Sequence, residues 1–308
     1  MKQSHPQVSL EQLCDLFGVT RQAFYEAAAQ EKKTSIAHVV VLRLVSDLRR
    51  DMPLLGTRKL FHLLQPQLDN HQIKMGRDQL FDLLGFHGLL IRRRKRMVKT
   101  TDSHHWLKKY PNLIKELTVD GPEQLWVSDL TYIRTVQGFS YLSLITDAYS
   151  RKVVGYALYP TLEATGCVLA LKMALKDRKR ITDYTLIHHS DRGIQYCSAQ
   201  YISLLENEQI AISMTQSGSP YDNALAERVN GIIKIEFFSQ TIYQNHQEAD
   251  LAITRAVARY NTQRPHSSLD YLTPEVAHER SGLLKKRWKQ YRRPKPIRQE
   301  DRVEPVMN

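Results

Sequence analysis

QLWVSDLTYIRT (124–135), FSYLSLITDAYS (139–150) and KVVGYALYP (152–160) are the stretches that decide the fold of this chain. Each is rich in β-branched and aromatic residues, and short polar or glycine-containing turns separate them. This pattern is typical of three β-strands that pair as an antiparallel meander. We therefore expect a β-sheet to begin near residue 124.

Helices and strands alternate after the meander. The sequence predicts a helix at 162–178, a strand at 184–191, a helix at 198–208, a strand at 210–216, and helices from 220 onward and at 248–260. Strands followed by alternating helices and strands imply a mixed sheet with helices on its faces. The predicted fold class is therefore α/β.

The residues that precede the sheet are predicted to be helical. Residues 9–29 are interpreted as two short helices around a turn at Gly18, the spacing of a helix-turn-helix, and further helices are expected at 36–50, 56–64 and 75–90. Ordinary helical hairpins share this pattern, so it does not establish DNA binding by itself. The exposed side chains that these helices would offer to DNA are Arg21, Gln22, Tyr25, Arg58, Lys59 and Arg77.

Positive charge is concentrated at the two ends of the chain. The formal charge is +9 over residues 1–110 and +5 over residues 271–308, but −2 over residues 111–270. Basic flanks favour a nucleic-acid partner, although a merely solvated surface would give the same counts. One basic run is expected to be extended along phosphates, because adjacent like charges repel; it comprises Arg92, Arg93, Arg94, Lys95 and Arg96.

Composition disfavours several other classes of protein. The hydrophobic content of 42% is ordinary for a globular protein, and no apolar run reaches the roughly 18 residues of a membrane span. The N-terminus lacks a signal pattern, so we expect a cytoplasmic protein without a membrane partner. Cys14, Cys167 and Cys197 lie far apart, which argues against a disulfide framework and against a zinc finger.

Two aspartates stand at positions where carboxylates are unusual. Asp129 lies in the middle of the first expected strand, where aspartate is depleted and where burial of its charge costs several kcal/mol unless something compensates it. Asp191 closes a later strand, and Gly193 permits a tight turn behind it. Carboxylates at strand ends project toward the cleft where ligands of α/β sheets commonly bind. A structural role for each aspartate remains the alternative.

Glu227 lies on the polar side of the helix expected from residue 220. Leu225, Val229, Ile232 and Ile233 form its apolar stripe, at the spacing of a face that packs on a core. Ser219, Pro220 and Asp222 resemble a capping box that starts the helix. The residues that share the face of Glu227 are Asn223, Asn230, Gly231 and Lys234. This face is either solvated or turned toward a ligand, and Gly231 would permit the close approach of another backbone or of a ligand.

Asp129, Asp191 and Glu227 together would supply the oxygen ligands that a pair of Mg²⁺ ions needs. Two such ions can hold the attacking and leaving oxygens of an in-line phosphoryl transfer. The scarcity of Cys and His clusters fits an oxygen-ligated metal better than zinc.

Three motifs together resemble the core of DDE transposases in the retroviral-integrase superfamily: WVSDLTYI, HSDRGIQY and SPYDNALAERVNGIIKIE. The 35 residues between Asp191 and Glu227 are the separation that this family shows. The segment YNTQRPHSSLDYLTPE (260–275) is similar to the one that follows the core in the family. LCDLFGVTRQAFY and GTRKLFHLL resemble the front of transposases encoded by the second reading frame of two-frame bacterial insertion sequences.

The resemblance implies a ribonuclease H-like core in which Asp129, Asp191 and Glu227 bind two Mg²⁺ ions, with Mn²⁺ able to substitute. Asn223 and Lys234 are then expected to support DNA near the scissile phosphate. The implied reaction cuts one strand at each terminal inverted repeat and uses the freed 3′-hydroxyl for strand transfer into target DNA. A dimer or higher oligomer is expected because two ends must be handled together, and a separate upstream-frame protein is a possible partner that adds a helix-turn-helix.

Two other functions remain open from the sequence. One is a non-catalytic DNA binder that represses transposition, which the intact set of carboxylates disfavours. The other is a structure-selective nuclease, which the basic flanks disfavour. The predicted regions are an N-terminal helix-turn-helix region at 1–50, a second such region at 51–98, a linker at 99–120, an integrase-type catalytic core at 121–278 and a basic tail at 279–308.

Overall fold

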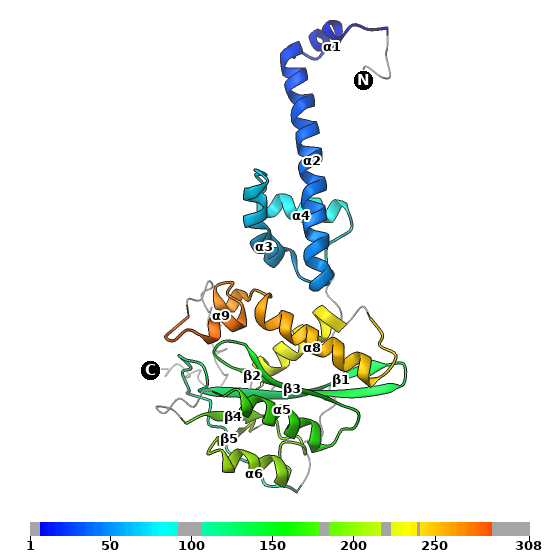
Figure 1. Cartoon of the computed structure of the whole chain (residues 1–308). Coiled ribbons are helices and arrows are strands. Elements are labelled where there is room, and N and C mark those ends of the chain that lie inside the picture. The colour runs from blue at the N-terminus through cyan, green and yellow to red at the C-terminus, as the bar shows by residue number, and fades with distance from the viewer. Residues whose placement is uncertain (1–6, 92–105, 179–184, 217–222, 239–240, 285–308) are drawn as a thin grey trace, which may run out of the picture.

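The computed structural model describes residues 7–91, 106–178, 185–216, 223–238 and 241–284. Figure 1 shows a helical unit, built from the N-terminal part of the chain, standing on a body that contains the sheet. The basic run Arg92–Arg96 and most of the predicted basic tail lie outside the described residues. Within the described part of the chain, no helix has the length and apolar character needed to cross a membrane.

A five-stranded mixed sheet forms the centre of the body, in the order β3-β2-β1-β4-β5. β1, β2 and β3 pair as the predicted antiparallel meander, and β4 and β5 join the edge of β1 in parallel. The sequence-based expectation of a mixed sheet is confirmed. The strands are β1 (Leu125–Thr135), β2 (Gly138–Asp147), β3 (Val153–Tyr159), β4 (Ile187–Ser190) and β5 (Ala211–Met214).

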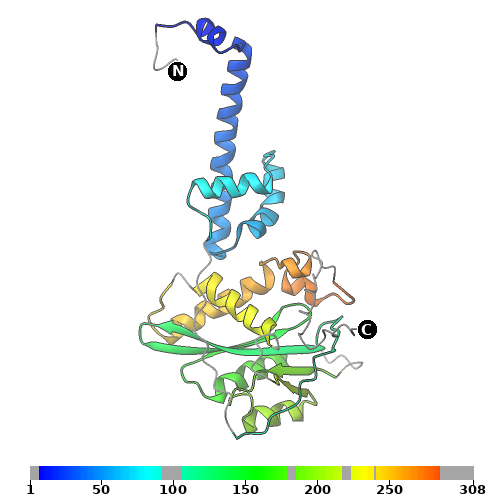
Figure 2. The same cartoon turned by 180° about the vertical axis from the view of Figure 1, so that it is seen from behind.

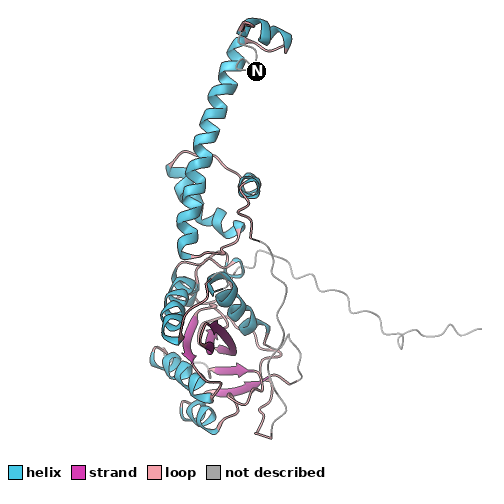
Figure 3. Cartoon of the chain, turned by 90° about the vertical axis from the view of Figure 1, so that its right-hand side faces the viewer, coloured by secondary structure: helices cyan, strands magenta, loops and turns pink. Residues whose placement is uncertain are grey.

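Helices cover both faces of the sheet, as Figure 3 shows from the side. Neighbouring residues of a strand point to opposite faces, so Leu144 packs under α7 and α8 while Ile145 packs against α5 and α6. Each face therefore has its own hydrophobic core. The covering elements are α5 (Ala164–Lys176), α6 (Ala199–Asn207), α7 (Ala224–Ile232), the π-helix η1 (Ile233–Phe237) and α8 (His246–Thr262).

The helical unit differs from the prediction in one respect. The helices expected at 20–29 and 36–50 form a single helix, α2 (Arg21–Asp51), because residues 30–35 contain neither glycine nor proline to end it. Its C-terminal half packs on the other helices through a core that includes Val41, Val45 and Leu60, and its N-terminal end contacts α1. The other helices of the unit are α1 (Leu10–Leu16), α3 (Thr57–Asn70) and α4 (Arg77–Phe86).

The helix that carries Glu227 begins later than predicted. α7 starts at Ala224 with Asn223 in the N-cap position, and the side chain of Asn223 caps no backbone group of the helix. The residues of the predicted capping box, Ser219, Pro220 and Asp222, lie outside the described residues. Its apolar stripe is confirmed, since Val229, Ile232 and Ile233 are buried and Leu225 packs beside them.

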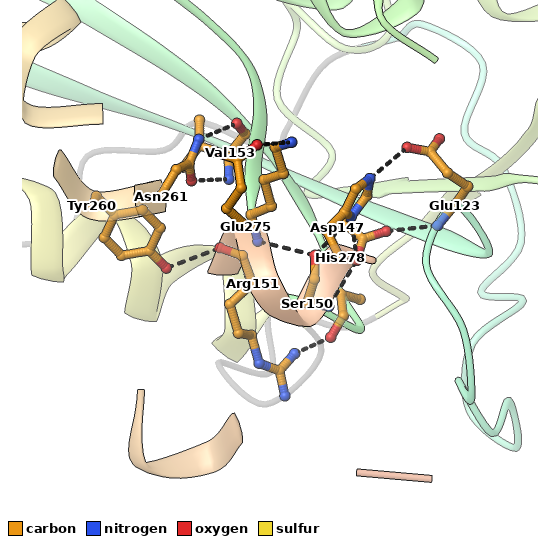
Figure 4. Close-up of polar contacts among 11 residues, drawn as sticks. Glu123, Asp147, Ser150, Arg151, Val153, Tyr260, Asn261, Glu275 and His278 are labelled. Atoms are coloured by element: carbon orange, nitrogen blue, oxygen red, sulfur yellow. Dashed lines mark hydrogen bonds and ion pairs between the residues drawn. The ribbon is translucent and has the colours of Figure 1, made fainter. Parts of the chain in front are cut away.

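A buried polar cluster fastens the segment after α8 to the sheet (Figure 4). This segment contains η2 (Ser267–Leu269) and α9 (Pro274–His278). His278 Nε2 lies 3.3 Å from Glu123 Oε1, and its Nδ1 lies 3.0 Å from Ser150 Oγ, which donates to Asp147 Oδ1. Burial opposes the charged imidazole, but hydrogen bonds to Asp147 and Glu123 and their charges raise the pKa of His278 to about 9.

Replacement of His278 by Gln is expected to destabilise the protein in a pH-dependent way. A raised pKa means that the contribution is complete below the unfolded pKa of about 6.5 and disappears as the pH rises through about 9. The loss in unfolding free energy should be about 2 kcal/mol at pH 6 and much smaller at pH 10. Urea unfolding at both pH values measures it, and an equal loss at both would contradict the charge pairing.

Gly155 and Gly231 form a matched pair for testing the packing of the core. A Cβ on Gly155 in β3 would lie 2.2 Å from the Ala170 carbonyl oxygen of α5, whereas one on Gly231 would meet no described atom within 4 Å. Gly155→Ala should therefore lower the unfolding free energy by about 1–3 kcal/mol. Gly231→Ala should be neutral or stabilise the helix by up to about 1 kcal/mol. Urea unfolding of both variants would refute this packing if their order were reversed.

Candidate active site

Asp129 lies on the central strand β1, opposite Leu144 of β2. Its carboxylate Oδ2 accepts a 2.7 Å hydrogen bond from Asn230 Nδ2 of α7. Burial raises the pKa of Asp129 to about 7, and the charges of Asp191 and Glu227 act in the same direction, while the bond from Asn230 partly offsets them. Asp191 and Glu227 are therefore both close enough to Asp129 to act on it electrostatically.

Asp191 follows directly on β4, which runs parallel to β1. In this parallel pair Val127 lies beside His189, so Asp129 and Asp191, each two residues further along, are brought toward each other. The backbone N–H of Gly193 donates to Asp191 Oδ1 at 2.9 Å. A Cβ on Gly193 would lie 3.0 Å from that oxygen and 3.2 Å from Gln195 Oε1, so the tight turn favours glycine.

Glu227 is exposed on α7, and polar contacts hold this helix against β1 on either side of it. Asn223 Nδ2 donates to the Ser128 carbonyl oxygen at 3.0 Å, and Asn230 binds Asp129. One further turn along, Lys234 Nζ lies 3.3 Å from Thr131 Oγ1 and 3.5 Å from the centre of the Tyr132 ring. The polar side of the helix is thus largely a docking face for β1, and Glu227 stands beside it.

From the sequence, Asn223 and Lys234 were predicted to contact DNA. In the structure, both side chains contact β1. Asn223 is only 5% exposed, and its side-chain amide already donates a hydrogen bond to a carbonyl oxygen of β1. Lys234 is half-buried, and burial lowers its pKa. Contact of either side chain with DNA stays a prediction.

Asn230 is the residue of this site that sequence reasoning left without a role. Its position three residues after Glu227 places it on the same helical face, but nothing in the sequence shows that its partner is Asp129. It is 4% exposed, and its Oδ1 has no hydrogen-bond partner among the described residues. Asn230 therefore positions Asp129 and leaves one buried oxygen acceptor beside the carboxylates.

A neutral histidine supports Asp129 from within the sheet. His188 Nε2 of β4 lies 2.7 Å from Ser128 Oγ and 2.9 Å from the Tyr201 hydroxyl. Burial lowers the pKa of His188 to about 3, so the ring stays uncharged at neutral pH. This contact joins β4 to β1 through the residue that precedes Asp129.

The donor chemistry of the site fits a hard divalent cation. Asp129, Asp191 and Glu227 offer carboxylate oxygens, which Mg²⁺ and Mn²⁺ prefer, and Asn230 adds an unused amide oxygen. In the described part of the chain, however, no three His, Cys, Asp or Glu side chains lie in an arrangement that could already hold a metal ion. The residue types fit the cation, and their spacing falls short of a closed site.

The remaining predicted DNA contacts lie on the helical unit. Arg21, Gln22 and Tyr25 are exposed on the first turns of α2, at the far end from the sheet (Figure 1). Arg58 of α3 and Arg77 of α4 are also exposed, and Arg77 pairs with Asp78 at 2.8 Å. The expected exposure of Lys59 is wrong, because it is half-buried where α3 meets the sheet-containing body.

Comparison with known proteins identifies the sheet-containing body as an integrase core domain. Two models of that description match residues 119–220 and 208–274. An uncharacterised 31 kDa protein of insertion element IS600 from Shigella sonnei is 35% identical over 275 residues, which span 87% of this chain and 98% of that protein. The transposase for insertion sequence element IS629 from Shigella sonnei is 32% identical over 224 residues, 73% of either chain.

The chain belongs to the insertion-sequence transposases of the retroviral-integrase superfamily, as the three sequence motifs predicted. Among solved structures, the HTLV-2 integrase catalytic core domain in complex with magnesium matches 51% of this chain and 97% of its own length. Its identity of 18% and TM-score of 0.39 are too low to add to the assignment.

Removal of the Asn230 amide should raise the pKa of Asp129 further, because the hydrogen bond from Asn230 favours the ionised carboxylate. The comparison is Asn230→Ala against wild type in metal-free protein, by NMR titration of the carboxyl carbons. Asn207→Ala, at an exposed position on α6, is the control and should leave the titration unchanged. An unchanged pKa of Asp129 in Asn230→Ala would mean that the bond does not form in solution.

Proposed function

We propose that this chain cleaves the ends of its insertion sequence and joins them to target DNA, using Asp129, Asp191 and Glu227 as the catalytic carboxylates. The observation that carries the proposal is that Asp191, which follows β4, and Glu227 of α7 both act electrostatically on Asp129 of β1. Elements far apart in the chain converge there. Carboxylates kept close at an energetic cost are typical of sites that bind cations or move protons.

The chain's own residues would do the positioning in this reaction. The three carboxylates supply the negative oxygens, Asn230 holds Oδ2 of Asp129, and the contact of His188 with Ser128 joins β4 to β1. Two bound Mg²⁺ ions, or Mn²⁺ in their place, would activate the attacking hydroxyl and stabilise the departing oxygen. Lys234 supplies a cation beside the same helical face, where a phosphodiester would pass.

The proposed substrates are the terminal inverted repeats of the element and a target duplex. The helical unit, with its exposed Arg21, Arg58 and Arg77, is proposed to bind the element end. A dimer or higher oligomer is proposed on paired ends, and a separate upstream-frame helix-turn-helix protein is a proposed partner. The division into regions at 1–50, 51–98, 99–120, 121–278 and 279–308 also stays a proposal.

Asp191→Asn should abolish strand joining while leaving DNA binding nearly intact. The amide keeps the shape and the hydrogen bond from Gly193 but removes the negative charge, so joining of an element-end duplex in Mg²⁺ should fall by about 100-fold to 1000-fold or more. Binding of the same duplex in the absence of metal should change little, because no phosphate contact is removed.

The control is Asp177→Asn, at the exposed end of α5 on the other face of the sheet, which should join ends as wild type does. If Asp191→Asn still joined ends at the wild-type rate, the catalytic assignment would be overturned. If it lost binding as well as joining, the variant would be misfolded, and Glu227→Gln would then be compared in the same way.

A further inference from the structure

The helical unit meets the sheet-containing body at the end of the helix that carries Glu227 (Figure 2). The Leu54 N–H donates to the carbonyl oxygen of Glu236 in η1, and the ring of Phe237 packs against the cores of both parts. The rings of His62 in α3 and Tyr271 stack at 4.7 Å. We call this contact zone the junction.

Positive charge gathers in the junction. Lys59 of α3 lies within electrostatic reach of Arg264 and Arg228, which belong to the body, and of one carboxylate, Glu236. Glu236 is already occupied, since its two oxygens accept hydrogen bonds of 2.6 and 2.7 Å from Arg264. The Arg264 side chain is 1% exposed and therefore serves the fold. Lys59 thus lies near two arginines and one carboxylate, and that carboxylate is already bound by Arg264.

Within the described part of the chain, two of these cations have no counter-charge of their own. Among the described residues, neither the Lys59 ammonium nor the Arg228 guanidinium makes a hydrogen bond or an ion pair. Arg228 is exposed on α7, whereas Lys59 is half-buried. Burial and the charges of Arg264 and Arg228 lower the pKa of Lys59 to about 8, although Glu236 acts in the opposite direction. An anion placed between the two side chains would relieve this repulsion.

The location of the two cations indicates which anion this is. Arg228 is the neighbour of Glu227 in the chain, and Lys59 stands on the first turn of α3, next to the exposed Arg58. A DNA strand that reached from the helical unit to the carboxylates would cross the junction at this point. Its phosphates are negative at every nucleotide, so they match two cations at different distances from Glu227.

We infer that Lys59 and Arg228 form a phosphate-binding site for the DNA backbone where it passes from the helical unit to the carboxylates. The inference rests on the proposed function, and it assigns to Arg228 a role that nothing in the sequence motifs suggested. Backbone contacts position a duplex without reading its sequence. The site would therefore set how far along the DNA the carboxylates act, and the base sequence would be read elsewhere.

The direct test measures binding without catalysis. Lys59→Gln, Arg228→Gln and the double variant are made in the Asp191→Asn chain, and binding to an element-end duplex is measured without metal at several salt concentrations. Each lost phosphate contact should reduce the slope of log affinity against log salt by about 0.9, and the double variant by about twice that. A random-sequence duplex of equal length should be affected to the same extent, because the contact is to the backbone.

Lys172→Gln is the matched control, because Lys172 is exposed on α5, on the opposite face of the sheet from α7. It should keep the parent slope. Wild-type slopes in both Lys59→Gln and Arg228→Gln, with unchanged affinity, would overturn the inference. A loss confined to the element-end duplex would overturn it too, since it would indicate base reading.

A second arm uses pH and guards against a folding defect in the Gln variants. The charged groups that face Lys59 are Arg264, Arg228 and Glu236, and His266 lies near them. A phosphate would favour the charged ammonium, so affinity should decline as the pH rises from 7 to 9. Lys59→Arg should bind as tightly at pH 7 and lose this decline, because arginine stays charged. A decline that persists in Lys59→Arg would place the titrating group elsewhere.

The outcomes separate this inference from the proposed function. If the wild-type chain fails to join element ends in Mg²⁺ but its DNA binding still depends on Lys59 and Arg228, the phosphate site is supported and the proposed reaction is contradicted. If the chain joins ends and the Gln variants bind DNA like their parent, the reaction is supported and the phosphate site is contradicted.

Discussion

The hydrogen bond from Asn230 to Asp129 is the interaction on which the arrangement of the site depends. An apolar stripe alone lets a helix slide and turn on a sheet, and a shift of one residue would rotate Glu227 by roughly 100° about the helix axis. The amide of Asn230, with Asn223 on Ser128 and Lys234 on Thr131, sets one register between α7 and β1. Because Asp129 itself is one of the acceptors, docking the helix and positioning the carboxylate are the same event.

This register brings carboxylates together at an electrostatic cost. The raised pKa of Asp129 records that cost, since burial and two neighbouring charges all disfavour its ionised form. The hydrogen bond from the Asn230 amide offsets part of this electrostatic cost. The proposed cations would offset the part that remains. His188 of the neighbouring strand is neutral, so it adds no positive charge that would compete with them.

The far end of the same helix is held just as firmly. After Ile232 the helix widens into η1, which presents Glu236 to Arg264 and its backbone carbonyl to Leu54. Irregular turns of this kind frequently occur at functional sites. The helix that carries Glu227 is therefore fastened to the sheet along its length and to the helical unit at its end. The junction cations Lys59 and Arg228 lie within electrostatic reach of each other, one on α3 and the other on this helix.

Local patterns in the sequence were sufficient for most of the fold and for selecting the candidate carboxylates. Runs of β-branched and aromatic residues between short turns indicated the meander, the 3.6-residue stripe indicated α7, and strand positions unsuited to carboxylates drew attention to Asp129 and Asp191. The continuous helix α2 was missed because the exposed polar residues 30–35 carry no apolar stripe to mark them as helical.

What the sequence alone determined, then, is which residue types lie on which face of each element. Only the tertiary structure decided that Asn230 binds Asp129, that Asn223 is buried, and that Lys59 is turned into the junction. These contacts join residues separated by about a hundred positions or more, and their partners follow from how the elements pack together. No local period encodes that packing.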